Sequence, residues 1–422
     1  MDALIIEGPT QLSGSVEVSG SKNSALPLLF ASILFNDKVC YENIPRLWDI
    51  ETTLKLLEMM GCGTEWDKEG GRVAIIPTVK SKLAPYEQVK KMRAGILALG
   101  PLVAKYGEAK VSLPGGCAIG ARPVNYHIEA LRKLGVTVEV EEGYIHASVV
   151  GKLVGAEILF PEVTVTGTEN LLYVGVMAEG KTVLQNAACE PEVVALGEFL
   201  NSCGAKISGL GTHTITIEGG SLVTPSHPVQ IPPDRIEAGT WVSIALATQS
   251  AIEITHCDTS QMTSVLAAFR QMGAKIEELN QGTCLKVIPT ERYNPLHIET
   301  APYPGFPTDM QAQILTLLCM AEGRSTVVES IFENRFMHVA ELQRLGAKIE
   351  INGNVATIEG PAKFRGAPIM ATDLRASACL VLAGLISKGT TKVSRIYHLD
   401  RGYQRLDEKL RRLGAKITRV AE

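Results

Sequence analysis

A short pattern recurs six times along this chain, and it constrains the fold more than any other feature. Each copy ends an amphipathic stretch with a glycine and passes at once into alternating residues, as in FRQMGAKIEE and LRRLGAKITR. Successive glycines are 74, 69, 69, 73 and 68 residues apart, which indicates six copies of one structural unit. The six are Gly61, Gly135, Gly204, Gly273, Gly346 and Gly414.

Every copy predicts the same order of secondary structure. The glycine is typical of the position that ends a helix. The alternating residues after it, such as AKIEINGNVATIEG at 347–360, predict two strands joined by a turn. Upstream, an apolar helix, a turn and a strand precede the second helix, as in LLCMAEGRSTVVES at 317–330. The unit is therefore strand, helix, strand, helix, strand, strand, which predicts an α/β fold with mixed sheets.

The last copy ends one strand short, and the start of the chain offers the missing piece. DALIIEGPT at 2–10 resembles NVATIEGPA at 354–362, so we expect this N-terminal strand to complete the sixth copy. Three copies each would give one domain at 22–232 and a second, discontinuous domain at 1–21 and 233–422. The Pro-rich stretch 225–233 is a suitable crossing, and two crossings would form a hinge that closes around a ligand.

Composition excludes several classes of protein. The chain is 45% hydrophobic and 20% charged, which is typical of a globular protein, and its net charge of −4 without a Lys/Arg-rich run argues against nucleic-acid binding. No apolar run is long enough to span a bilayer and residues 1–9 lack the pattern of a signal peptide, so we expect a cytoplasmic protein without membrane insertion. The nine cysteines show neither CxxC pairs nor metal-ligand spacing, which disfavours disulfides and zinc. A phosphate-binding GxxxxGK[ST] motif is missing as well.

Unusual polar residues fall in two equivalent places of the repeat. Those that open the apolar helix lie near helix N-termini, which favour anions. The arginines among both sets suit a compact ligand carrying phosphate and carboxylate, and one of Asp49, Asp309 and Asp373 could act as a general base. The first set is Lys22, Asn23, Arg93, Thr168, Glu169, Glu237, Asp309, Asp373 and Arg375. The second set, after the second strand, is Asp49, the stretch from Cys117 to Arg122, Glu190, Glu192, Asp258, Arg335, Asp400 and Arg401.

The stretch LPGGCAIGARP at 113–123 is the most unusual of these loops. Its glycines and prolines disfavour a regular helix around Cys117. Arg122 would favour the thiolate form and hold an anion. A buried, inert cysteine is the alternative, but the glycine-rich setting favours a reactive thiol.

The residues in these positions resemble a known family along the whole chain. The strings that carry the resemblance are GSKNSALPLL at 20–29, VKKMRAGILALGPLVA at 89–104, LPGGCAIGARP, DRIEAGT at 234–240, GFPTDMQAQ at 305–313, FENRFMH at 332–338, ATDLRASA at 371–378 and YHLDRGYQR at 397–405. They resemble the UDP-N-acetylglucosamine 1-carboxyvinyltransferases, a branch of the enolpyruvyl transferases. The resemblance implies an inside-out α/β barrel, with two domains of three βαβαββ repeats each.

The resemblance also implies a reaction. The enolpyruvyl group of phosphoenolpyruvate would pass to the 3-hydroxyl of UDP-N-acetylglucosamine by addition and elimination, releasing phosphate, in the first committed step of peptidoglycan synthesis. No metal and no organic cofactor are implied, and we expect a monomer. The epoxide fosfomycin would alkylate Cys117.

Site residues follow from the resemblance in the same way. Cys117 would protonate the methylene carbon and Asp309 would take the sugar hydroxyl proton, with Lys22 and Arg401 completing the catalytic set. Lys22, Arg122 and Arg401 would hold the phosphate and carboxylate of phosphoenolpyruvate. The implied substrate-binding residues are Lys22, Asn23, Arg93, Arg122, Pro123, Val124, Asn125, Tyr126, Glu162, Thr164, Val165, Thr166, Asp309, Ile331, Arg335, Arg375 and Arg401.

The chain departs from the family pattern at a few positions. Asn125 and Tyr126 stand where relatives often have Asp and Leu, Glu162 stands where a Lys can reach the nucleotide, and Leu97 replaces a Trp. Two alternatives remain. A shikimate-pathway enolpyruvyl transferase would lack the thiol at this place, and a non-catalytic UDP-sugar sensor would have no need of thiol, base and anion ligands together.

Overall fold

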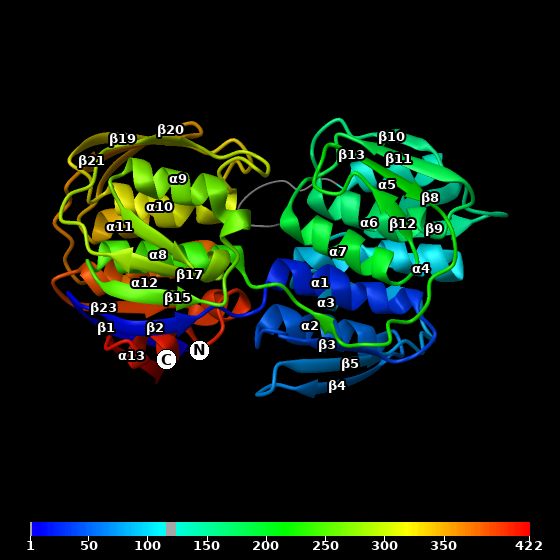
Figure 1. Cartoon of the computed structure of the whole chain (residues 1–422), viewed down its shortest axis with the longest axis horizontal. Helices are drawn as coiled ribbons and strands as arrows, with labels where there is room; N and C mark the ends of the chain where they lie inside the picture. Colours follow the sequence, from blue (N-terminus) through cyan, green and yellow to red (C-terminus); the bar gives the residue numbers. More distant parts are fainter. Residues whose placement is uncertain (1, 115–123) are drawn as a thin grey trace. The chain divides into compact units, whose positions relative to one another are not determined.

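The computed structural model describes residues 2–114 and 124–422, and these residues form six four-stranded sheets (Figure 1). All six follow one plan. The first strand runs parallel to the second, the second is antiparallel to the last strand of the copy, and the last is antiparallel to the third. The six-copy prediction, and the α/β fold with mixed sheets, are therefore confirmed.

Three of the sheets belong to the first half of the chain. Their strands, in sheet order, are β14 (Val229–Gln230), β3 (Val39–Glu42), β5 (Arg72–Ile76) and β4 (Gly63–Asp67); β6 (Leu83–Ala84), β7 (Glu108–Ser112), β9 (Tyr144–Val149) and β8 (Val136–Glu141); and β10 (Glu157–Leu159), β11 (Lys181–Gln185), β13 (Thr214–Glu218) and β12 (Lys206–Ser208).

The other three sheets belong to the second half together with the N-terminus. Their strands are β2 (Ser13–Glu17), β15 (Ala251–Thr255), β17 (Cys284–Ile288) and β16 (Lys275–Leu279); β18 (His297–Glu299), β19 (Gly323–Val328), β21 (Val355–Gly360) and β20 (Lys348–Asn352); and β22 (Pro368–Met370), β23 (Gly389–Ser394), β1 (Asp2–Gly8) and β24 (Lys416–Ala421).

Strand β1 completes the sixth copy. Leu4 lies opposite Val393 of β23 and Arg419 of β24, so β1 holds the place that β21 holds in its own sheet. Leu4 and Ile6 are fully buried, because alternate residues of β1 face the core. The prediction for the N-terminal strand is confirmed.

The chain divides into two compact units, one containing residues 2–19 and 233–422 and the other residues 20–114 and 124–232. Each unit completes its sheets with strands from a distant part of the chain, and β1 is one of them. β2 pairs in parallel with β15, and β14 pairs in parallel with β3.

The first helix of most copies is buried on nearly all sides, because its sequence is apolar all round. In the unit that holds residues 233–422, these helices lie between the sheets (Figure 1) and form its core. They are α8 (Arg235–Ala247), α10 (Gln311–Leu318) and α12 (Leu374–Ile386) in that unit, and α1 (Lys22–Ala31), α4 (Leu99–Tyr106) and α6 (Val165–Gly175) in the other.

The second helix of each copy ends at the repeated glycine. All six glycines have φ between 90° and 107°, a left-handed conformation that suits a residue without a Cβ, and the predicted helix ends are confirmed. These helices are α2 (Trp48–Met59), α5 (Asn125–Lys133), α7 (Pro191–Ser202), α9 (Thr263–Gln271), α11 (Val339–Arg344) and α13 (Leu406–Arg412), while α3 (Tyr86–Val89) is a short extra turn.

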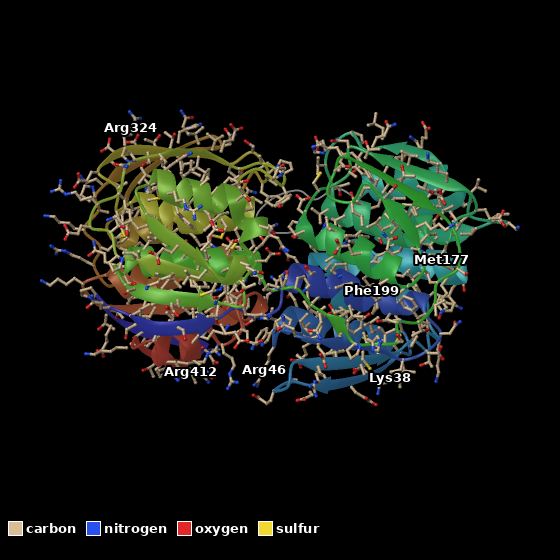
Figure 2. The ribbon with its side chains drawn as sticks, in the orientation of Figure 1. Lys38, Arg46, Met177, Phe199, Arg324 and Arg412 are labelled. Carbon is tan, nitrogen blue, oxygen red and sulfur yellow. The ribbon has the colours of Figure 1, made fainter. Side chains whose placement is uncertain are left out.

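Charged side chains cover the outer surface of both units. Figure 2 labels four of them, Lys38, Arg46, Arg324 and Arg412. Lys38 pairs with Glu65 at 2.6 Å, and such exposed pairs contribute little to stability. In the part of the chain that the structure describes, no helix combines the length and apolar character needed to cross a membrane. The eight cysteines of that part are all free thiols.

Candidate active site

Asp309 lies between two buried arginines. It sits in the 3₁₀ turn η5 (Thr308–Met310), directly before α10. Oδ1 accepts a hydrogen bond from Arg335 Nη2 at 2.9 Å, and Oδ2 accepts from Arg375 Nε at 3.2 Å and Nη2 at 3.0 Å. Both arginine side chains are 3–4% exposed, whereas that of Asp309 is 27% exposed. The carboxylate is therefore accessible, while the cations that neutralise it are buried beneath the surface.

Arg375 is held by the start of α12 and by its surroundings. Asp373 caps this helix and accepts from the backbone N–H of Arg375 and Ala376. The guanidinium lies 5.4 Å from the ring centroid of Tyr403. Burial, the largest single cause, acts to lower the pKa of Arg375, but Asp309, Tyr403 and Asp234 together outweigh it, and the pKa is raised above its usual value. Arg375 stays charged at any pH at which the protein folds.

Tyr403 belongs to a buried hydrogen-bond network behind Arg375. Thr240 donates its hydroxyl proton to Ile236 O at 2.8 Å, so its oxygen must accept from Tyr403 Oη, 3.0 Å away. Gln313 Nε2 donates to both hydroxyl oxygens, at 3.0 and 3.1 Å. The network joins α8, α10 and the segment before α13, and it fixes the ring against which Arg375 packs.

Each of the two guanidinium groups has N–H donors that do not bind Asp309. The Nη1 atoms of Arg335 and Arg375 are buried and have no hydrogen-bond partner among the described residues. Buried N–H groups without a partner are costly, and an anion that accepted from them would remove this cost. The Asp309 cluster therefore suits a second anion.

In the other unit, Lys22 and Asp49 form a second, partly buried ion pair. Lys22 Nζ lies 3.5 Å from Asp49 Oδ2, and the side chains are 13% and 5% exposed. Lys22 is the first residue of α1, which Ser21 caps by accepting from Ser24 N. Asp49 sits in the first turn of α2, where a carboxylate is favoured. The predicted anion ligand Lys22 is thus held near a helix N-terminus.

Three buried glutamates lie near one another, and one of them contacts Asn23. Asn23 Nδ2 donates to Glu192 Oε1 at 3.5 Å. Glu169, Glu190 and Glu192 are all buried. Burial first, and then the charges of Glu192 and Glu190, raise the pKa of Glu169 well above its usual value. Burial and the two neighbouring carboxylates therefore favour the neutral form of Glu169.

His127 lies between Asn170 and the predicted substrate-binding residue Thr166, a contact which the sequence did not indicate. Asn170 Nδ2 donates to His127 Nδ1 at 3.0 Å, because Asn170 Oδ1 is already the acceptor for Gly100 N. The imidazole proton is then on Nε2, which lies 3.4 Å from Thr166 Oγ1. Burial and the charge of Arg93 lower the pKa of His127 to about 3. The ring is neutral and orients Thr166.

Tyr126 and Glu162, two positions at which the chain departs from the family pattern, are neighbours. Burial, the charge of Glu162 and a hydrogen bond to it raise the pKa of Tyr126. Thr164 caps α6 and accepts from Gly167 N at 3.2 Å. The predicted nucleotide-binding residues Asn125, Tyr126, Glu162, Thr164, Val165 and Thr166 thus lie at or near the N-terminal ends of α5 and α6.

Other polar residues from the repeat comparison have structural partners. Glu237 accepts from Lys409 Nζ at 2.6 Å and from Ser19 N at 3.0 Å, and Asp400 pairs with Arg419 at 2.6 Å. Asp258 accepts from Ser260 N at 3.1 Å. These carboxylates therefore stabilise the fold of the unit to which they belong. Cys117, Arg122 and Pro123 lie outside the described residues.

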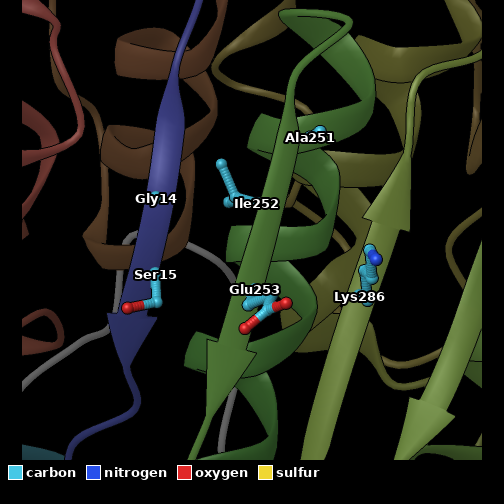
Figure 3. Close-up of a pocket in the computed structure, with 6 residues that line it drawn as sticks. All are labelled: Gly14, Ser15, Ala251, Ile252, Glu253 and Lys286. Atoms are coloured by element: carbon cyan, nitrogen blue, oxygen red, sulfur yellow. The ribbon is translucent and has the colours of Figure 1, made fainter.

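A shallow hollow of about 370 Å³ lies elsewhere, on the outer face of the sheet that contains β2, β15 and β17 (Figure 3). Ser15 is opposite Glu253, and Glu253 is opposite Lys286. None of the predicted site residues lines this hollow, and its lining provides no buried polar group. We assign it no part in the chemistry.

Comparison with known proteins first defines the class. The profile of the EPSP synthase (3-phosphoshikimate 1-carboxyvinyltransferase) family matches residues 6–410, so the chain belongs to that family. The enolpyruvyl transferase NikO from Streptomyces tendae has the same fold, with a TM-score of 0.89, 25% identity and coverage of 100% of this chain and 99% of that one. EPSP synthase from Acinetobacter baumannii gives a TM-score of 0.76 at 19% identity, with both chains fully covered.

Closer relatives define the branch. The chain is 52% identical over 423 residues to UDP-N-acetylglucosamine 1-carboxyvinyltransferase of Desulfovibrio desulfuricans, covering 99% of each chain. It is 53% identical to the protein of the same name from Nitratidesulfovibrio vulgaris strain Hildenborough and 51% identical to that of Aeromonas hydrophila, with full coverage in both cases. Within the family, the chain therefore groups with the UDP-N-acetylglucosamine 1-carboxyvinyltransferases, and the resemblance inferred from its motifs is confirmed.

Proposed function

We propose that this enzyme transfers the enolpyruvyl group of phosphoenolpyruvate to the 3-hydroxyl of UDP-N-acetylglucosamine and releases phosphate. Full-length identity of about half to proteins named for this reaction supports the assignment. The observation that carries it in the structure is the Asp309 cluster, an accessible carboxylate bound by two buried arginines. The cluster combines a base for a hydroxyl group with cations for a phosphate or carboxylate.

Asp309 is the proposed general base for the sugar hydroxyl. As it stands, three charge-assisted hydrogen bonds stabilise its ionised form and make it a weak base. A bound phosphoenolpyruvate would accept from Arg335 and Arg375 and loosen their hold on Asp309. The proton affinity of Asp309 would then rise when the acceptor sugar needs a base.

Lys22, Arg93 and Arg401 are proposed to bind the substrates together with Arg335 and Arg375. For Cys117 we propose the role of the acid that protonates the methylene carbon, and for Arg122 that of a further anion ligand. Fixed positive charges of this kind stabilise developing negative charge without reorganisation. The proposed chemistry needs neither a metal nor an organic cofactor.

The nucleotide is proposed to lie along Pro123, Val124, Asn125, Tyr126, Glu162, Thr164, Val165, Thr166 and Ile331. Support comes from the position of Thr164–Thr166 in the first turn of α6, whose N–H groups favour phosphate oxygens. Tyr126 and Glu162 would accept hydrogen bonds from the uridine as one unit, because the hydroxyl proton of Tyr126 is already donated to Glu162. Asn23 would meet the sugar.

The barrel architecture, the domain limits and the biological setting of the reaction are proposals as well. We propose that each unit is one half of an inside-out α/β barrel, which the burial of α8, α10 and α12 within their unit supports. The proposed domain limits are residues 22–232 on one side, and 1–21 with 233–422 on the other. The proposed setting is the first committed step of peptidoglycan synthesis, in the cytoplasm, by a monomeric enzyme sensitive to fosfomycin.

Phosphate release tests the proposal. The protein is incubated with phosphoenolpyruvate and either UDP-N-acetylglucosamine or shikimate 3-phosphate, and the sugar product is identified by mass. We expect phosphate and an enolpyruvyl adduct with the UDP-sugar only. Turnover of shikimate 3-phosphate alone would favour the shikimate-pathway alternative. Binding of the UDP-sugar without any release would favour a sensor.

A further inference from the structure

Glu329 is a buried carboxylate on which four donors converge. It directly follows β19, and only 3% of its surface is exposed. Oε1 accepts from Thr300 Oγ1 at 2.9 Å, Ile331 N at 2.9 Å and Phe332 N at 3.2 Å. Thr308 Oγ1 donates to both carboxylate oxygens, at 3.0 and 2.9 Å. Every partner is a donor, so a group that only accepts is required here.

Equivalent positions in other copies are built differently. The residue after the second strand adopts a left-handed conformation in four copies, with φ of 55–60°, whereas Glu329 does not. In three of those copies the side chain bonds to the carbonyl oxygen that follows the first strand, at 2.8–3.1 Å. The four residues are Asn43, Asn186, His256 and Arg395. In the copy that contains Glu329, a buried, hydrogen-bonded carboxylate therefore takes the place of the left-handed residue.

This difference occurs in the copy that also contains Asp309 and Arg335. Thr308 directly precedes Asp309, and Ile331 and Phe332 begin the segment that leads to Arg335. Glu329 thus ties together the backbone segments on both sides of the 2.9 Å bond between Asp309 and Arg335. A carboxylate with four donors fixes these two segments relative to each other.

We propose that Glu329, acting through Thr308 and the Ile331–Phe332 backbone, is a positioning residue that holds Asp309 and Arg335 in the arrangement the reaction needs. This inference rests on the proposed function, because it assigns Glu329 to the same site. Glu329 touches neither substrate in this role. Its contribution is geometric, and misplacement of a catalytic group by about 1 Å can cost about a hundredfold in rate.

The test uses a substitution that the repeat itself tolerates. Glu329→Asn introduces the residue found at two equivalent positions, Asn43 and Asn186, so the turn can form while the carboxylate centre is lost. We expect kcat to fall about 10- to 100-fold, with the melting temperature within a few degrees of wild type. The matched control is Glu299→Gln. Glu299 is exposed and accepts from Ser330 Oγ at 3.0 Å in the same loop, and this variant should keep full activity.

A second pair of variants separates positioning from folding. Thr308→Val removes the hydroxyl that joins Asp309's segment to Glu329, and Thr308→Ser retains it. We expect the valine variant to lose kcat with an unchanged KM for the UDP-sugar, and the serine variant to recover it. Equal kcat in wild type and Thr308→Val would overturn the inference, as would parallel losses of kcat and melting temperature in all variants. Wild-type protein without phosphate release would instead contradict the proposed function.

Discussion

Asp309 and Arg375 are joined by two hydrogen bonds from one guanidinium to one oxygen, Nε to Oδ2 at 3.2 Å and Nη2 to Oδ2 at 3.0 Å. The other carboxylate oxygen is taken by Arg335. Both oxygens of the proposed base are therefore engaged before any substrate binds. We therefore expect that an anion must compete for these arginines before Asp309 can accept a proton.

Arg375→Lys should separate anion binding from sugar binding. A lysine keeps the charge but cannot make the two-point contact with Asp309 or pack flat on Tyr403. We expect kcat/KM for phosphoenolpyruvate to fall about a hundredfold, while KM for the UDP-sugar changes less than threefold. Steady-state kinetics with each substrate varied in turn measures both. Arg324→Lys is the matched control, because Arg324 is exposed on β19 (Figure 2). An equal effect from the control would contradict the prediction.

Tyr403→Phe tests the network behind Arg375. The change removes one hydroxyl and leaves Gln313 Nε2 and Thr240 Oγ1 with one bond fewer each, in a fully buried place. The free energy of unfolding should fall by about 1–3 kcal/mol, the usual cost of an unpaired buried polar group. Urea denaturation measures it, with Tyr86→Phe at an exposed position as the control. Unchanged stability would show that the network contributes nothing.

His127 should make the protein sensitive to acid. Its pKa is about 3 in the folded state against an ordinary 6.5, so between these values the unfolded chain binds more protons than the folded one. Stability from this residue is present above pH 6.5 and is lost as the pH falls towards 3, by about 1.4 kcal/mol per pH unit.

Urea unfolding of wild type and His127→Gln between pH 7.5 and 4.5 isolates this effect. The difference in unfolding free energy between wild type and variant should shrink or reverse as the pH falls, because the variant lacks the titrating imidazole. The exposed His227→Gln variant should follow wild type throughout. Parallel pH profiles for wild type and His127→Gln would contradict a buried neutral ring.

The fold could be predicted from the sequence because its repeated elements depend on local backbone conformation. The glycines at 61, 135, 204, 273, 346 and 414 all have positive φ, and a helix end that needs this conformation selects glycine whatever surrounds it. The similarity of residues 2–10 to 354–362 reflects the same place in a sheet, which β1 and β21 occupy.

The partners of the polar residues could not be predicted in the same way. Glu237 pairs with Lys409 and Asp400 with Arg419, and such contacts depend on how distant segments pack rather than on local pattern. Glu329 resembles an ordinary solvent-facing charge in the sequence. The residue after the second strand differs among the copies, with Asn43, His256 and Arg395 as examples, so a comparison of this position does not single out Glu329.

The most direct test of the account is single-turnover phosphate release by Asp309→Asn. The amide keeps the shape of the carboxylate but cannot accept the sugar proton. We expect calorimetry to show a UDP-N-acetylglucosamine affinity within about threefold of wild type. Phosphate release should slow by about 10²- to 10⁴-fold, because that is the usual contribution of a positioned general base. A rate within tenfold of wild type at unchanged sugar affinity would show that Asp309 is not the base.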